Sequence, residues 1–296
     1  MAKAAKKSTA VAVASRTAFA VAKTTPDRLK GYKGPLGTEN IDSADVTIPR
    51  LKIAQSLTPE VKDGKLDEGA LFLNVTGQPV WKKGDDALPL IILSQAKEYI
   101  LWRPREDNGG GILARAKPVR KDGVTRYRWD KPNQSFEVKV GGKVKVVWKT
   151  KEYIDQDGLA EWGSEIPGDK ESGIAATAHH NYAVMLPTCE NVVAALSMSK
   201  SGVKKAKDLN AALKMDTSAP IWEKVFSLET VEEVGQGGPT ERYSNWSVKP
   251  AGYIANDDLV ALTKNIAASF QQTGFTVDQS DEDDGEPASG GKSGRV

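Results

Sequence analysis

Hydrophobic and polar residues alternate along the middle of the chain, with the period of two that is typical of half-buried strands. The clearest case is Phe136–Val140, then Gly141-Gly142, then Lys143–Lys149. A Gly-Gly pair between two alternating runs predicts a β-hairpin. One face of this hairpin is either a cationic binding surface or the ordinary polar side of an amphipathic hairpin, and it carries Lys139, Lys143, Lys145 and Lys149.

Other short apolar runs, rich in β-branched and aromatic residues, also predict strands. These runs are residues 46–53, 70–75, 88–93, 98–102, 125–129, 181–186, 192–198, 221–232 and 243–250. Apolar residues at helical spacing predict helices over 202–215 and 256–270. Many short strands with few helices predict a β-rich barrel or sandwich with helical additions.

Composition divides the chain into a basic arm (residues 1–40), a folded core (41–275) and a disordered acidic tail (276–296). No run approaches the roughly 18 apolar residues of a membrane span. The single Cys189 excludes an intramolecular disulfide, which favours a cytoplasmic location.

Charge is arranged in opposed blocks behind a net charge of +2. Residues 97–151 hold fifteen Lys or Arg against six Asp or Glu, whereas residues 152–171 hold seven acids and only Lys170. The tail segment 278–286 holds six acids and no base. Such blocks predict a face that binds polyanions and a tail that binds partner proteins through Asp281, Glu282, Asp283 and Asp284.

Motifs for catalysis are missing from the sequence, so we expect a non-enzymatic protein without a cofactor. There is no phosphate-binding loop and no nucleophile elbow. His179-His180 and the lone Cys189 do not have the spacing of a zinc site. The carboxylates between Asp155 and Glu165 could hold a divalent ion, but a solvated acidic loop is the favoured interpretation, and no metal is expected.

Cations and aromatic residues interleave between Tyr99 and Trp148, as binding of single-stranded nucleic acid requires. Within this stretch we expect Trp102 and Trp148 in the core, and Tyr127 and Trp129 exposed for base stacking. A second basic element lies at the start of the helix over 202–215. The predicted contacts are Arg103, Arg105, Arg115, Arg126, Tyr127, Trp129, Lys143, Lys145, Lys200 and Lys204.

Residues 48–55, 101–105, 109–115, 196–200 and 246–253 together resemble the bacteriophage single-stranded DNA-binding proteins. The resemblance implies an OB-type barrel, a role in phage DNA replication or recombination in the infected bacterial cell, and an acidic tail for replication or recombination proteins. Two features depart from that family. The cysteines expected near Trp162-Gly163 are missing, which puts a zinc site in doubt, and the chain continues beyond the acidic stretch to Val296.

The resulting prediction is a β-rich, elaborated OB-type barrel with a few peripheral helices and disordered termini. It should coat and protect single-stranded DNA with little sequence preference. Two alternatives remain open: a phage structural or assembly protein without DNA binding, and a metal-dependent nuclease built on residues 155–165.

Overall fold

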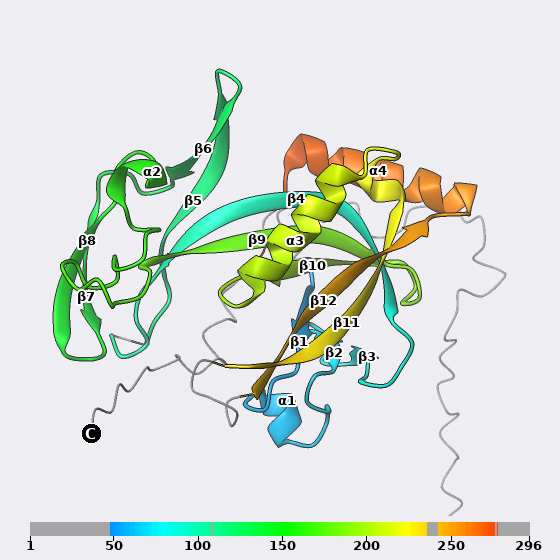
Figure 1. The fold of residues 1–296 in the computed structure, drawn as a ribbon, viewed down its shortest axis with the longest axis horizontal. Helices are drawn as coiled ribbons and strands as arrows, with labels where there is room; N and C mark the ends of the chain where they lie inside the picture. The colour runs from blue at the N-terminus through cyan, green and yellow to red at the C-terminus, as the bar shows by residue number, and fades with distance from the viewer. Residues whose placement is uncertain (1–47, 108, 236–241, 276, 278–296) are drawn as a thin grey trace, which may run out of the picture. The chain divides into compact units, whose positions relative to one another are not determined.

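Most of the alternating segments form strands, because a period of two places their apolar side chains on a buried face of a sheet. The computed structural model describes residues 48–107, 109–235, 242–275 and 277 (Figure 1). The strands in these ranges are β1 (Arg50–Ile53), β2 (Leu71–Leu73), β3 (Pro79–Trp81), β4 (Leu88–Trp102), β5 (Ile112–Lys121), β6 (Val124–Trp129), β7 (Ser135–Val140), β8 (Val144–Lys149), β9 (Ala176–Leu186), β10 (Val192–Met198), β11 (Lys224–Val234) and β12 (Arg242–Tyr253). The helices there are α1 (Pro59–Lys62), α2 (Ile154–Asp157), α3 (Gly202–Met215), α4 (Asp257–Thr273) and the 3-10 helix η2 (Ile221–Glu223).

Ten of these strands pair in one mixed sheet, which confirms the β-rich class with few helices. Its main order is β12-β11-β4-β9-β10-β1-β2-β3, with β5 added to β4 and β6 added to β5. Strands β1 and β10 are parallel, and the other pairs are antiparallel. Within the described residues β12 and β3 end the sheet without pairing with each other, so the predicted OB-type barrel is wrong. Helices cover both faces of the central strands, so the sheet buries its apolar residues without closing on itself.

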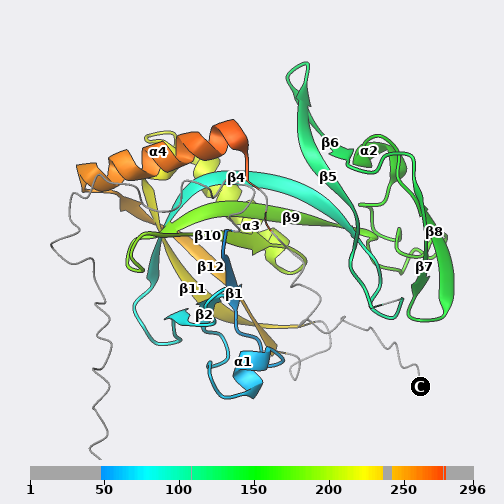
Figure 2. The same cartoon turned by 180° about the vertical axis from the view of Figure 1, so that it is seen from behind.

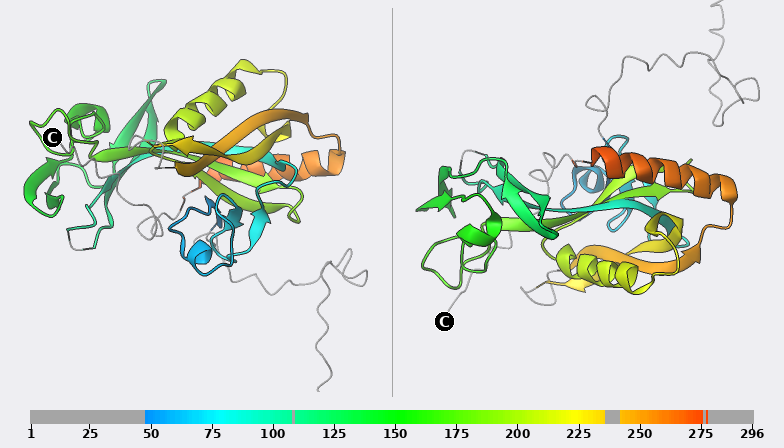
Figure 3. Two further views of the ribbon diagram at one scale, coloured as in Figure 1. Left: turned by 60° about the horizontal axis from the view of Figure 1, so that its bottom comes forward. Right: turned by 90° about the horizontal axis from the view of Figure 1, so that it is seen from above.

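The long strands β4 and β9 form the centre of this sheet, and one helix lies on each face of it (Figure 3). Alternate residues such as Ile92 and Val184 pack on the side of α3, in a cluster with its Leu209. The intervening residues Ile91 and Met185 pack on the side of α4, in a cluster with Ala267. Figure 2 shows the α4 side from in front. The even and odd residues of β9 therefore face two different environments.

A separate cluster lies where β4, β5 and β6 run beyond the two helices. One face of the β7–β8 hairpin packs against these strands, and its side chains Val138, Val146 and Trp148 are buried in this cluster. Gly141 and Gly142 both have positive φ, as the predicted hairpin turn requires. Lys139, Lys145 and Lys149 are exposed on the opposite side. These positions confirm the predicted hairpin and three lysines of its predicted face, whereas Lys143 lies in the turn before β8.

The described elements belong to one compact unit. None of the helices among the described residues is long and apolar enough to cross a membrane. The predicted basic arm (1–40) lies outside the described residues. So do residues 278–296 of the predicted tail, among them Asp281, Glu282, Asp283 and Asp284.

Candidate nucleic-acid interface

Strands β5 and β6 form a two-stranded ribbon that projects beyond the sheet (Figure 1). Strand β5 pairs with β4 only as far as Ala116, so from Lys117 onward its one partner strand is β6. The ribbon turns at Asp122 and Gly123, whose φ angles of 52° and 77° fit a tight hairpin turn. Residues 117–125 are all exposed. The ribbon therefore presents both of its faces to solvent.

The register of the ribbon separates its side chains into two faces. Lys117 pairs with Arg128, and Val119 pairs with Arg126, so these residues share one face. The other face carries Tyr127 opposite Pro118, followed toward the tip by Arg120. The predicted contacts Arg126 and Tyr127 thus lie on opposite faces of the ribbon.

A cluster of one lysine and two tyrosines lies at the base of the face that carries Tyr127. Tyr127 meets Tyr99 edge-to-face, with ring centroids 5.0 Å apart. The ammonium of Lys97 lies 4.6 Å from the Tyr99 centroid and 5.2 Å from that of Tyr127, and it donates a 2.7 Å hydrogen bond to the Tyr99 hydroxyl. All three side chains are partly exposed. Burial, together with the neighbouring Tyr99, raises the pKa of Tyr127. We call Lys97, Tyr99 and Tyr127 the Lys–Tyr patch.

Helix α3 adds cations on the same side of the sheet. His180 is paired with Lys97 across β9 and β4, and its Nδ1 lies 3.4 Å from Asn210 Nδ2 of α3. Burial, then the positive charges of Lys97 and Lys207, lower the pKa of His180 to about 4. Both lysines are therefore close to one imidazole. Lys204 is exposed on the same helix as Lys207, and Lys200 lies just before the helix begins.

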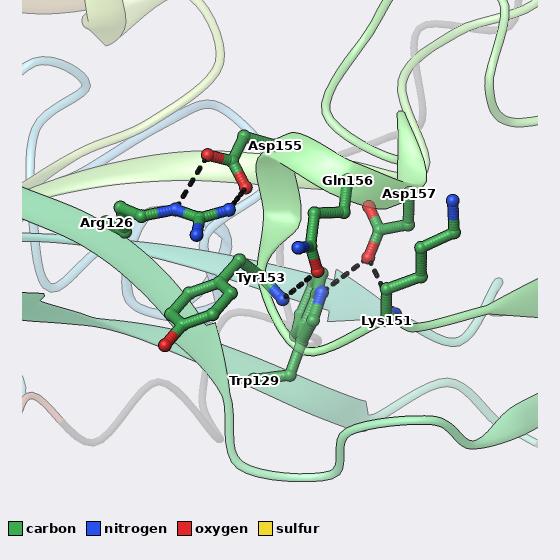
Figure 4. Close-up of polar contacts among 7 residues, drawn as sticks. All are labelled: Arg126, Trp129, Lys151, Tyr153, Asp155, Gln156 and Asp157. Carbon is green, nitrogen blue, oxygen red and sulfur yellow. Dashed lines mark hydrogen bonds and ion pairs between the residues drawn. The ribbon is translucent and has the colours of Figure 1, made fainter.

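Arg126 lies on the other face of the ribbon and pairs with an acidic side chain. Its guanidinium makes two hydrogen bonds to Asp155, of 3.0 and 2.6 Å, and lies over the Tyr153 ring at 3.9 Å (Figure 4). The hydrogen bond from Arg126 lowers the pKa of Asp155, and that of Arg126 is raised in turn. A phosphate at Arg126 would have to replace this carboxylate.

Trp129 is buried, which makes the prediction of an exposed stacking residue wrong. Its side chain is 2% exposed, and its indole Nε1 donates a 2.6 Å hydrogen bond to Asp157 (Figure 4). The indole fills the core between β6 and the hairpin because its neighbours there are apolar, and Asp157 satisfies its polar atom. Trp148 is also 2% exposed, as predicted, whereas Trp102 is only partly buried.

The carboxylates considered for a metal point to different partners. Asp155 binds Arg126, Asp157 binds Trp129, and Glu165 accepts a hydrogen bond from the Gly173 amide. The segment predicted as a loop begins within α2, whose C-cap Gly158 has positive φ. In the part of the chain that the structure describes, no three His, Cys, Asp or Glu side chains gather as metal ligands would.

Arg115 lies on the side of the sheet that α4 occupies. It is 3.6 Å from the buried Glu98, which also accepts a 2.8 Å hydrogen bond from Asn181. Burial raises the pKa of Glu98 despite the charge of Arg115. Burial also lowers the pKa of His179 to about 3, aided by the positive charges of Arg50, Lys200 and Arg115. Glu98, His179 and Asn181 are buried there, and Arg115 is largely buried.

The remaining predicted contacts are dispersed. Arg103 pairs with Asp107 at 2.8 Å in the connection between β4 and β5, and Arg105 is exposed nearby in sequence. Lys143 and Lys145 are exposed on the β7–β8 hairpin.

Of the predicted residues, the structure therefore brings Tyr127 and Lys204 to one side of the sheet, whereas Lys200 lies near His179. To the side of Tyr127 the structure adds Lys97, Tyr99, Arg120 and Lys207, which the prediction left out. Alternation along β4 places Lys97 and Tyr99 on one face, and this was the signal available for them.

Comparison with known proteins gives one match. Residues 17–276 match the family model described as Pam3 phage gp34-like protein. No curated protein and no solved structure shows significant similarity to the chain. The matched region includes every element of the ribbon and of the Lys–Tyr patch. The chain belongs to the family of Pam3 phage gp34-like proteins.

Proposed function

We propose that this phage protein binds single-stranded DNA without catalysis, through the Lys–Tyr patch and the cations beside it. The observation that supports the proposal is the contact of Lys97 with both Tyr99 and Tyr127 on a partly exposed surface. Two adjacent aromatic rings offer stacking surfaces to unpaired bases, and cations next to them offer partners to phosphates. The exposed Arg120 extends this surface along the ribbon, and Lys207 extends it toward α3.

The arrangement favours single strands over duplex. Stacking on a tyrosine requires a base whose face is open, and duplex DNA keeps its base faces stacked on each other. Phosphate contacts from the ribbon and α3 fix the strand but do not read its sequence. We therefore expect tight binding with little sequence preference.

The test is equilibrium binding of a fluorescent oligonucleotide of about 30 thymidines, compared with a duplex of the same length, from low to moderate salt. If Lys97, Arg120, Lys204 and Lys207 each neutralise one phosphate, the log–log salt slope should be about −2.8. We expect the single strand to be favoured by at least about tenfold. Weak binding that ignores strandedness would overturn the proposal and favour a structural or assembly protein.

Variants in the patch separate stacking from charge. Tyr127→Ala should weaken binding by about 1–3 kcal/mol, the value of one stacked base, whereas Tyr127→Phe should retain most of the affinity. Lys97→Ala should reduce the magnitude of the salt slope by about 0.7. Lys264→Ala is the matched control, because Lys264 is an exposed cation on α4, at the opposite side of the sheet. An equal loss in all four variants would contradict an interface at the patch.

A further inference from the structure

Trp162 differs from the other tryptophans in its exposure. All seven tryptophans lie in described residues, and Trp162 is the one whose side chain is mostly exposed, at 69%. Exposed tryptophan is uncommon, because its large apolar ring gains most when it is buried. Tryptophan is also among the residues that contribute most to binding at protein interfaces. Its exposure therefore points to a contact with another molecule.

The loop that carries Trp162 is held by many hydrogen bonds. Next to Trp162, the Gly163 amide lies 3.1 Å from the carbonyl oxygens of both Ser172 and Gly173. The hydroxyl of Ser164 donates to Leu159 O and accepts from the Ala175 amide. The buried Trp148 donates its Nε1–H to Glu165 O at 3.1 Å, which joins the loop to the hairpin core. A loop fixed in this way presents the ring without a large entropic cost on binding.

Gly163 is required for this presentation. Its φ is +86°, in the left-handed region that favours glycine. A Cβ atom at this position would also lie 3.3 Å from Asp169 O and from Lys170 Cα, closer than most contacts. The backbone beside Trp162 therefore packs directly on the segment that follows Gly168.

The charges around this loop are mainly negative. Glu161 adjoins Trp162, and Asp169 and Glu171 flank the backbone on which Gly163 packs, with Lys170 as the cation between them. All four of these charged residues are exposed. Carboxylates repel a phosphate backbone, so this surface is unfavourable for DNA. They attract lysine and arginine, whose cations also bind the face of an indole.

We propose that Trp162 is the centre of a docking surface for a lysine- or arginine-rich segment of a partner protein. A basic side chain of the partner lies over the indole, and neighbouring cations pair with Glu161, Asp169 and Glu171. Ile174, 42% exposed, follows Gly173, whose carbonyl oxygen accepts from the Gly163 amide, and offers the partner an apolar side chain on the same loop. This proposal does not rest on the proposed DNA-binding function.

The test is ¹⁹F NMR of the full chain labelled with 5-fluorotryptophan, titrated with a nona-arginine peptide. Trp162→Phe identifies the Trp162 resonance by its disappearance. We expect the peptide to shift this resonance selectively, and a strand of about 30 thymidines to leave it unchanged. A resonance unmoved by the peptide would overturn the proposal. A resonance moved by the oligonucleotide instead would assign Trp162 to nucleic-acid binding and would equally overturn it.

Peptide affinity, measured by fluorescence anisotropy with labelled nona-arginine, supplies the second readout. Trp162→Ala and Glu161→Lys should each weaken peptide binding by about fivefold or more. Met215→Ala, which removes a side chain 85% exposed at the end of α3, should leave it unchanged. Affinity for single-stranded DNA should stay within about twofold in all three variants. Equal peptide affinity in Trp162→Ala and the unmodified chain would refute the docking surface even if other acidic segments bind the peptide.

Discussion

Replacing Trp129 by phenylalanine distinguishes a structural from a DNA-binding role for this residue. The sequence sets Trp129 among Arg126, Arg128 and Lys131 and predicts that it stacks on a base. In the structure its ring is buried and its Nε1–H donates to the Asp157 carboxylate at 2.6 Å. Trp129→Phe keeps an aromatic ring in the core but removes this donor. We therefore expect lower stability and unchanged affinity for single-stranded DNA.

The expected loss has two parts. A hydrogen bond to a charged group contributes about 1.5–3 kcal/mol to stability. The smaller ring loses apolar burial worth about 1 kcal/mol. Trp129→Phe should therefore lower the free energy of unfolding by about 2.5–4 kcal/mol.

A double-mutant cycle isolates the hydrogen bond. Asp157→Ala also removes the acceptor of the Lys151 and Leu159 amides, but that loss is the same with either aromatic residue. In the Asp157→Ala background, Trp129→Phe should cost only about 1 kcal/mol. The coupling energy should thus be about 1.5–3 kcal/mol.

The assay is urea unfolding followed by far-ultraviolet circular dichroism, which does not depend on the indole signal. Binding of the thymidine oligonucleotide is measured separately, in buffer where each variant is folded. A coupling energy below about 0.5 kcal/mol would refute the structural account. A folded Trp129→Phe variant that binds the oligonucleotide tenfold more weakly would show that the ring contacts DNA.

Two further predictions concern pH and the tail. The chain has two histidines, and both are buried, with the pKa of His179 lowered to about 3 and that of His180 to about 4. In the unfolded chain the histidines take up protons below about pH 6.5, whereas in the folded chain they stay neutral until the pH is near 4 or 3. The stability that the neutral histidines contribute is therefore fully present above about pH 6.5 and is lost as the pH falls. Between pH 7.5 and 5.5 the free energy of unfolding should fall by about 1.4 kcal/mol for each histidine. Urea unfolding at the two pH values measures this fall. In His179→Gln the free energy of unfolding should fall by about 1.4 kcal/mol less than in the unmodified chain, and equal falls in the two proteins would contradict this assignment. Val277, buried and bonded to Arg115 through its carbonyl oxygen, directly precedes the acidic segment. Deleting residues 278–296 should tighten oligonucleotide binding at low salt, because a competing polyanion is removed; unchanged affinity would count against this competition.

Elements specified by local sequence could be predicted well. The Gly141-Gly142 hairpin follows from the turn residues and the alternation around them. Helix α3 has the predicted bounds, because its apolar residues recur at helical spacing. Strand β10 likewise matches the predicted run of apolar residues. In each case the determining signal lies within the element itself.

The barrel and the division of β4 were wrong for a long-range reason. The mostly polar segment 94–97 suggests a break between two strands, yet β4 continues through it because β9 pairs along its length. A register shift between Ile92 and Ser94 absorbs the change of pattern. The residues before it are apolar on both faces because α3 and α4 cover both. No local pattern shows that these two distant helices cover opposite sides of one sheet.

The candidate site was predicted only in part, because charge in sequence differs from charge on a surface. The basic block before residue 151 and the acidic block after it fold against each other. Arg126 pairs with Asp155, and Arg128 lies 3.6 Å from Glu152. Partners about 29 and 24 residues away thus neutralise one face of the ribbon, and no local excess of lysine and arginine reveals this.

The other face of the ribbon lacks such ion pairs among the described residues, and that asymmetry is the reason for placing the proposed DNA-binding surface there. The carboxylates that pair with cations of the ribbon, Asp155 and Glu152, lie on the side of Arg126 and Arg128. The register turns Tyr127 and Arg120 to the other face. Lys97 contacts the Tyr99 hydroxyl and two aromatic rings and lies opposite His180, and none of these neighbours is a carboxylate. A phosphate can meet Lys97 without displacing a carboxylate, but at Arg126 it must compete with Asp155. The same acidic block that neutralises one face also surrounds Trp162, so one charge reversal in the sequence separates a surface suited to DNA from one suited to a basic protein segment.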